Sequence, residues 1–195
     1  MKRISVITLL TLLTICSVVA QGRLGLKTNL LYGAVSFTPN LGIEIGLGQR
    51  TTLDISGGYN WFNLDGHKKN NKKLVHWLIQ PEIRYFLCEK FNGHFFGLHA
   101  LFSQYNVGGY NLPMFFGRGS DAYRHQGWAA GVGITYGYQV MLSAHWNLEF
   151  SLGVGYARLE YDKYDCPTCG KNLGRQVKNY FGPTKAAISL IYIIK

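Results

Sequence analysis

The sequence lacks several features that would define common protein classes. After residue 20 no apolar run reaches the roughly 20 residues that a membrane-spanning helix needs. The paired glycines Gly131 and Gly133 lie inside a predicted strand, not in a phosphate-binding loop before a helix. No serine lies in a nucleophile-elbow motif. These absences argue against a helical membrane protein and a nucleotide-binding enzyme.

Charge is also missing from one long segment, and this is the main clue to the architecture. Residues 127–142 alternate between two faces, as a β-strand does. One face carries Trp128, Val132, Ile134 and Tyr136, whereas the other carries glycine and small polar residues. A strand of a water-soluble sheet would expose Lys, Glu, Asp or Arg on its non-core face. The observed pattern favours lipid on one side and a narrow lumen on the other.

The first twenty residues predict a signal peptide. Lys2 and Arg3 form a basic start, residues 4–19 are mostly apolar, and Ala20 ends a small-residue cleavage site. We therefore predict a cleaved segment over residues 1–20 and one exported domain over residues 21–195.

Seven further segments alternate, although less regularly. The predicted strands are residues 23–32, 41–48, 51–62, 74–87, 94–106, 127–142, 146–157 and 180–194. Pro81 interrupts the fourth, and the register of the fifth is left open. Tight links follow the second, fourth and sixth strands, while the other links are generally longer. This pattern predicts an all-β, eight-stranded antiparallel up-and-down transmembrane β-barrel in the outer membrane of a Gram-negative cell.

The inward parity of these strands predicts a polar network in the lumen. Its members are Lys27, Glu44, Glu82, Arg84, Glu149 and Lys185. Three cations then face three carboxylates, which suits a buried cluster because buried charges need partners. A barrel of eight strands is narrow enough for side chains to fill. We expect no pore.

Cys166 and Cys169 form a Cys-x-x-Cys motif in a predicted loop. A disulfide that stiffens the loop is the simplest interpretation for an exported protein. Zinc would need a second pair of ligands, which this loop lacks. A redox motif would sit at a helix start in a thioredoxin-like fold. We predict neither a metal nor a cofactor.

Basic residues gather in the predicted long loops. The candidates are Lys68, Lys69, Lys72, Lys73, Arg118 and Arg124. They could contact phosphates of outer-leaflet lipopolysaccharide or an acidic partner, or they could form a solvated rim that keeps the loops apart. Nothing in the sequence indicates binding of nucleic acid. Aromatic residues near the predicted strand ends favour a membrane-interface girdle; they are Trp61, Trp77, Trp128, Tyr138 and Trp146.

Two alternative functions follow from the same residues. A lipid-modifying enzyme would need a nucleophile in contact with a base, and the candidates are Ser120, Asp121 and His125 in one loop and Ser103 with His99 on the fifth strand. Neither set has a specific signature, so we predict no enzyme. A soluble exported barrel that binds a small apolar ligand is the other alternative. It would point Val132 and Ile134 inward.

Several segments are also distinctive as sequence. They are residues 27–32, 39–44, 76–85, 88–95 and 180–185. Together they resemble a family of uncharacterised exported proteins of the Bacteroides group, known only as a domain of unknown function. The resemblance implies a small outer-membrane barrel with a structural, anchoring or surface-interaction role, sometimes encoded near surface-adhesin or fimbrial components. It implies no activity and no catalytic residues.

Overall fold

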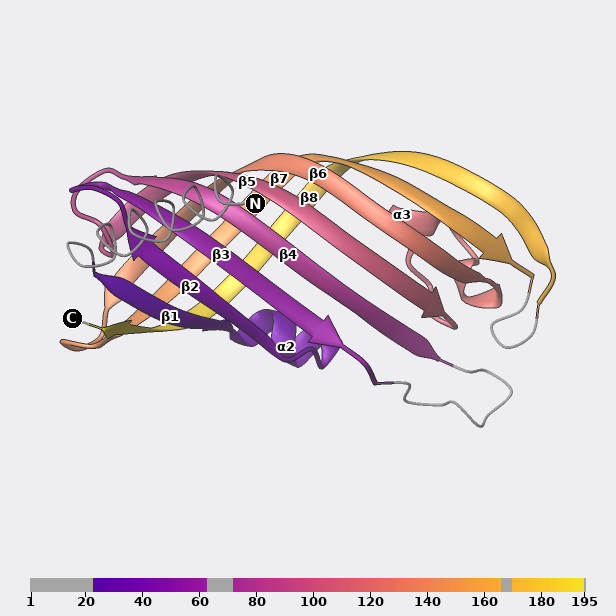
Figure 1. The fold of residues 1–195 in the computed structure, drawn as a ribbon, viewed down its shortest axis with the longest axis horizontal. Helices are drawn as coiled ribbons and strands as arrows, with labels where there is room; N and C mark the ends of the chain where they lie inside the picture. Colours follow the sequence, from indigo (N-terminus) through magenta and orange to yellow (C-terminus); the bar gives the residue numbers. More distant parts are fainter. Residues whose placement is uncertain (1–22, 63–71, 166–169, 195) are drawn as a thin grey trace, which may run out of the picture.

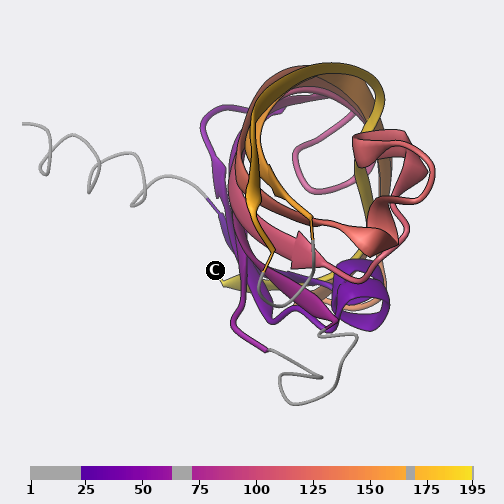
Figure 2. The same ribbon diagram turned by 90° about the vertical axis from the view of Figure 1, so that its right-hand side faces the viewer.

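The computed structural model describes residues 23–62, 72–165 and 170–194. Within them, eight antiparallel strands pair in chain order and the first closes on the last to form a barrel (Figures 1 and 2). The strands are β1 (Leu24–Asn29), β2 (Asn40–Gly46), β3 (Thr51–Asn60), β4 (Lys73–Phe86), β5 (Gly93–Gly108), β6 (Arg124–Met141), β7 (Trp146–Tyr164) and β8 (Asn172–Ile194). The predicted all-β, up-and-down fold of eight strands is confirmed.

In the described ranges, three short helices accompany the strands. They are α2 (Leu30–Ser36), α3 (Pro113–Phe116) and the 3-10 helix η1 (Ser120–Ala122). None of the helices in the described residues is long and apolar enough to cross a membrane. The predicted signal segment, residues 1–20, lies outside the described residues, as do Cys166 and Cys169.

The two faces of β6 point as the alternation predicts. Val132 and Ile134 are 58% and 64% exposed on the outside of the barrel, while Thr135 is 2% exposed in the lumen. Glycine is needed on the inward face because the barrel is narrow. A Cβ atom added to Gly133 would lie 2.6 Å from the backbone oxygen of Val154. The small inward residues therefore let neighbouring strands and lumen side chains approach closely.

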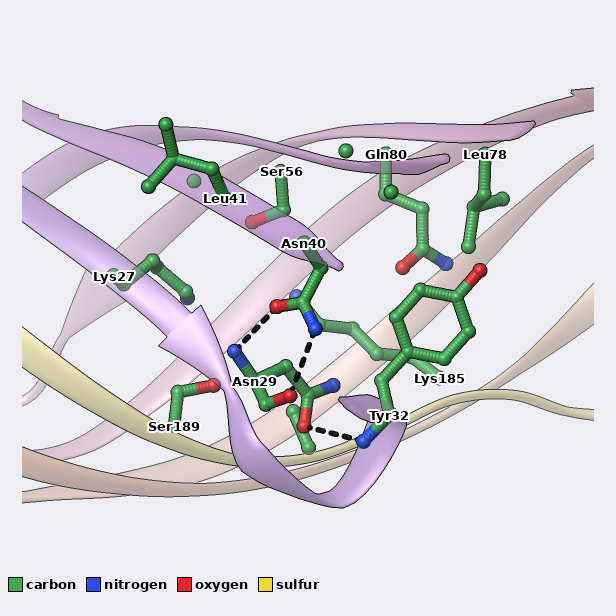
Figure 3. A pocket seen from close by; sticks show the side chains of 14 residues that line it. Lys27, Asn29, Tyr32, Asn40, Leu41, Ser56, Leu78, Gln80, Lys185 and Ser189 are labelled. Atoms are coloured by element: carbon green, nitrogen blue, oxygen red, sulfur yellow. Dashed lines mark hydrogen bonds between the residues drawn. The ribbon is translucent and has the colours of Figure 1, made fainter. Parts of the chain in front are cut away.

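The first strand is shorter than the sequence predicts, because the chain turns into helix α2 after Asn29. The Asn29 side chain accepts a hydrogen bond from the Tyr32 backbone N–H, which caps the helix N-terminus. Asn40 bonds to both the backbone N–H and the carbonyl of Asn29 (Figure 3). These two asparagines end the strand at a position where apolar periodicity alone would continue it.

The last two strands are longer than predicted. The sequence predicts a loop from residue 162 to 179, yet β7 continues to Tyr164 and β8 begins at Asn172. The outward residues of β7 become charged there, while its inward Leu159 and Tyr161 stay apolar and buried. As a result, β4 to β8 run past the ends of β1 and β2 (Figure 1). β1 pairs with β8 only between Ser189 and Ile194.

Two open points of the pattern are resolved by the strand pairing. Pro81 lies inside β4 opposite Ile55 of β3, while the ladder to β5 skips Gln80 and Pro81. The ladder is interrupted where proline has no N–H to donate. On β5, His99 and Leu101 are buried in the lumen, whereas Leu98 and Phe102 are exposed on the outside.

Candidate functional site

The lumen contains a cluster of ion pairs centred on Arg84, which is fully buried. Its guanidinium nitrogens lie 2.6 Å from Asp54, 2.7 Å from Glu82, 2.8 Å from Glu149 and 2.9 Å from Glu44. The planar fork of an arginine can donate to several carboxylates at once, which a lysine cannot do in one plane. One side chain from β4 therefore ties together carboxylates from four different strands.

Two lysines complete the charge cluster. The Lys27 ammonium lies 2.9 Å from Asp54 and 3.2 Å from Glu149, and that of Lys185 lies 2.6 Å from Glu82. The structure places all six predicted lumen residues in this cluster. The sequence reasoning missed Asp54, although it alternates with the outward Leu53 and Ile55 and so has the inward parity. With Asp54 included, three cations meet four carboxylates.

Neutral side chains satisfy the remaining carboxylate oxygens. Thr52 donates to Glu44 at 2.7 Å, and the Gln139 amide donates to Glu44 at 3.0 Å and to Glu149 at 2.9 Å. Toward the tight turns, Phe86 and Phe95 are fully buried beside the cluster. The Arg84 guanidinium stacks over the Phe95 ring at 4.7 Å. This half of the lumen is filled.

A layer formed by His99 and the two threonines that bond to it separates the ion pairs from the other half of the lumen. His99 lies 2.8 Å from the Thr135 hydroxyl and 2.9 Å from the Thr184 hydroxyl. The single Thr135 proton is donated to Glu82, so Thr135 accepts from the His99 Nδ1–H. The neutral ring then accepts at Nε2 from Thr184. His99 is thereby held in one tautomer by hydroxyl groups from β6 and β8.

Beyond this layer lies an apolar cavity of about 320 Å³. Its walls come from β4 to β8, helix α2 closes one side, and α3 covers the end away from the turns. The lining residues are Tyr32, Ser36, Leu74, His76, Leu78, Leu101, Ser103, Tyr105, Val107, Leu112, Phe115, Phe116, Ala129, Ala157, Leu159, Tyr180, Pro183 and Thr184. None of them carries a permanent charge. The pattern missed this cavity because its walls come from residues far apart in sequence.

The cover over the cavity is held by aromatic contacts. The Phe116 ring stacks on His125 with 4.2 Å between ring centres and meets Tyr161 edge-on at 5.2 Å. The rings of Phe115 and Tyr180 are tilted by 33° to each other, with 5.0 Å between their centres. Burial and the nearby charge of Lys163 lower the pKa of His125 to about 4. His125 is therefore neutral near pH 7 and serves as a packing surface.

One polar group in the cavity wall has no partner. The Tyr105 hydroxyl is buried and makes no hydrogen bond to any described residue. Leaving such a group unpaired costs about 1–3 kcal/mol. The other hydroxyls at the cavity are engaged: Ser103 donates to the Trp77 carbonyl and Tyr180 to the Pro183 carbonyl.

Figure 3 shows a smaller hollow of about 40 Å³ between the charge cluster and helix α2. Lys27, Lys185, Gln80 and Ser56 contribute polar side chains to it. This volume suits a water molecule or two rather than an organic ligand.

The basic candidates are only partly brought together. Lys68 and Lys69 lie outside the described residues, and Lys72 and Arg118 are exposed in loops. Lys73 and Arg124 both pair with Gly108, so they flank it in one row at the open end of the barrel. Some other charges at this end are paired: Arg175 donates to Glu160, which lowers the pKa of Glu160.

The residues considered for catalysis do not form a catalytic unit. Ser120 donates to the Tyr110 carbonyl and accepts from the Leu112 backbone N–H, whereas His125 packs on Phe116. His99 and Ser103 bond to different partners, as described above. In the described part of the chain, no group of three or more His, Cys, Asp or Glu side chains is placed to hold a metal ion.

Comparison with known proteins places the chain in a family without assigning a role. No curated protein and no solved structure matches it significantly. A family model described as "Protein of unknown function (DUF3575)" matches residues 6–194. The chain therefore belongs to this family. Its closed barrel, with one charged and one apolar half of the lumen, is the structure of one family member.

Proposed function

We propose that the protein is a non-enzymatic barrel that spans the bacterial outer membrane, is closed to ions, and serves as a surface anchor or interaction platform. The observation that carries this proposal is the apolar band on the outside of the barrel. Large hydrophobic side chains are exposed on every long strand, including Ile83 on β4, Leu98 on β5, Ile134 on β6 and Leu152 on β7. A continuous surface of this kind would promote aggregation in water.

The dimensions of the band fit a bilayer. On β6 it runs from Trp128 to Tyr138 and on β7 from Trp146 to Tyr156, with apolar outward residues between them. These spans match the roughly 9–11 residues of a membrane-crossing β-strand. Aromatic rings at both ends of each span suit the headgroup zones.

The outward face becomes polar where the strands continue past the band. Gln126 on β6 and the charged Arg158, Glu160 and Asp162 on β7 lie there. Strand pairing continues between these residues, so β6, β7 and β8 project together. Such a projection supports an extracellular platform.

The filled lumen supports a barrel that does not conduct. The ion pairs around Arg84 occupy the cross-section, and Phe86, Phe91 and Phe95 are buried on the side of the tight turns. Moving an ion through this layer would break several buried charge contacts at once, which is costly.

The architecture is tested by gel migration of the protein from an outer-membrane fraction, with and without boiling. A compact barrel resists detergent until it is heated, so we expect faster migration before boiling. In planar bilayers, we expect no stepwise conductance. A soluble periplasmic protein with no heat-dependent shift would exclude the proposal.

The surface role is tested by charge reversal at the open rim. We expect Lys73→Glu combined with Arg124→Glu to weaken association with vesicles that contain lipopolysaccharide. Lys90→Glu, in the tight turn between β4 and β5 at the opposite end, is the matched control. Equal binding by both variants would show that the basic rim makes no contact with phosphates.

A further inference from the structure

The apolar cavity in the lumen combines a large internal volume with an absence of charge. At about 320 Å³ it falls at the small end of known ligand pockets, roughly 300–1,000 Å³. The cavity is partly open to the outside rather than sealed, and it interrupts an interior that is otherwise close-packed in proteins. An apolar void also holds water poorly and instead takes apolar molecules.

The lining determines the charge of an occupant. Among the described residues, no Lys, Arg, Asp or Glu contributes to the wall. The one histidine, His76, is already occupied: its Nδ1 lies 3.1 Å from the Leu74 carbonyl and its Nε2 lies 2.6 Å from the Tyr32 hydroxyl. An ionised headgroup inside the cavity would lose its hydration and gain no counter-charge. The occupant is therefore uncharged.

The Tyr105 hydroxyl adds one polar requirement. Tyr105 is more than nine-tenths buried, lines the cavity, and has no hydrogen-bond partner among the described residues. Buried hydroxyls in proteins are almost always bonded. A ligand that brings one donor or acceptor group would satisfy it.

We propose that the cavity binds a single uncharged, mainly hydrocarbon molecule that carries one hydrogen-bonding group, with that group bonded to Tyr105. The volume fits one small molecule or one chain, not a whole phospholipid. Ala129 and Ala157 leave the space on β6 and β7, and Phe116 covers the end. This proposal rests on the cavity and not on the placement in a membrane: if the protein is soluble, the experiment below is run in buffer without nanodiscs, with circular dichroism as the check on folding.

The test uses the full barrel in lipid nanodiscs and radiolabelled dodecanol, with empty nanodiscs as the background. We expect saturable binding of one dodecanol per barrel. Ala129→Phe fills the cavity and should weaken binding at least about tenfold. Ala130→Phe places the same ring on the outward face one residue along β6 and should leave binding unchanged.

A second variant tests the polar contact. Tyr105→Phe removes only the hydroxyl, so dodecanol should bind about fivefold more weakly while competition by dodecane, which cannot form a hydrogen bond, is unaffected. The unboiled gel shift checks that each variant is folded. The proposal is overturned if no saturable binding exceeds the background, or if the folded Ala129→Phe and Ala130→Phe variants bind alike.

Discussion

Removal of the Arg84 charge should destabilise the barrel severely. In Arg84→Met the apolar replacement has a similar length, but two lysines then face four carboxylates in place of three cations. The formal charge of the cluster changes from −1 to −2, and contacts of 2.6–2.9 Å to four carboxylates are lost. Breaking a buried ion pair by removing one partner costs about 3–5 kcal/mol. We expect at least that loss.

The assay is reversible unfolding by urea or guanidinium in lipid vesicles, followed by tryptophan fluorescence. Gln139→Met is the control for the loss of hydrogen bonds, because Gln139 donates to Glu44 and Glu149 but is neutral. It should cost less than Arg84→Met. In the double variant Arg84→Met with Glu149→Met, two lysines face three carboxylates and the formal charge returns to −1. If this double variant is no more stable than Arg84→Met alone, charge balance does not govern the cluster.

Three further predictions concern other parts of the barrel. Ile134→Lys should lower the free energy of unfolding in vesicles by about 2–4 kcal/mol, and Gln126→Lys by under about 1 kcal/mol. Equal losses would show that the apolar band does not end between these two residues. Gly133→Ala adds a Cβ 2.6 Å from a neighbouring backbone oxygen and should lower the free energy of unfolding by about 1–3 kcal/mol, unlike Gly57→Ala, where the nearest atom is 3.3 Å away. The pKa of His125 falls from its ordinary value of 6.5 to about 4 on folding. The unfolded chain therefore binds the proton first, and stability should fall as pH drops through that window; a denaturant titration at several pH values should show a smaller fall in His125→Phe.

Alternation made most of the fold predictable from the sequence. On β6, a period of two with glycine opposite large apolar residues is enough to predict both the strand and the face that points outward. The six predicted lumen charges follow from the same parity. Asp54 shares that signal, and counting every inward charge would have found it.

Other features depend on contacts that a periodic pattern does not contain. Helix α2 begins because Asn29 and Asn40 bond to backbone groups, while Leu30 and Leu31 continue the apolar pattern of the strand. The extension of β7 is stabilised by pairing with β8, although its charged outward residues look like a loop. The cavity depends on which small residues of different strands face each other across the barrel, and the sequence of any one strand does not predict this.

The first strand is held by the two shortest ladders of the sheet, with six residue pairs to β8 and four to β2. β1 and β8 pair only between Ser189 and Ile194, whereas β7 pairs with β8 along nearly its whole length. Because few backbone hydrogen bonds hold β1 on either side, the ring should open first and close last at this strand. Amide hydrogen exchange should therefore be fastest in β1, and assembly should proceed by completing a curved sheet of β2 to β8 before its final strand docks. β1 would thus be the last strand to join the barrel, although it is the first strand along the chain.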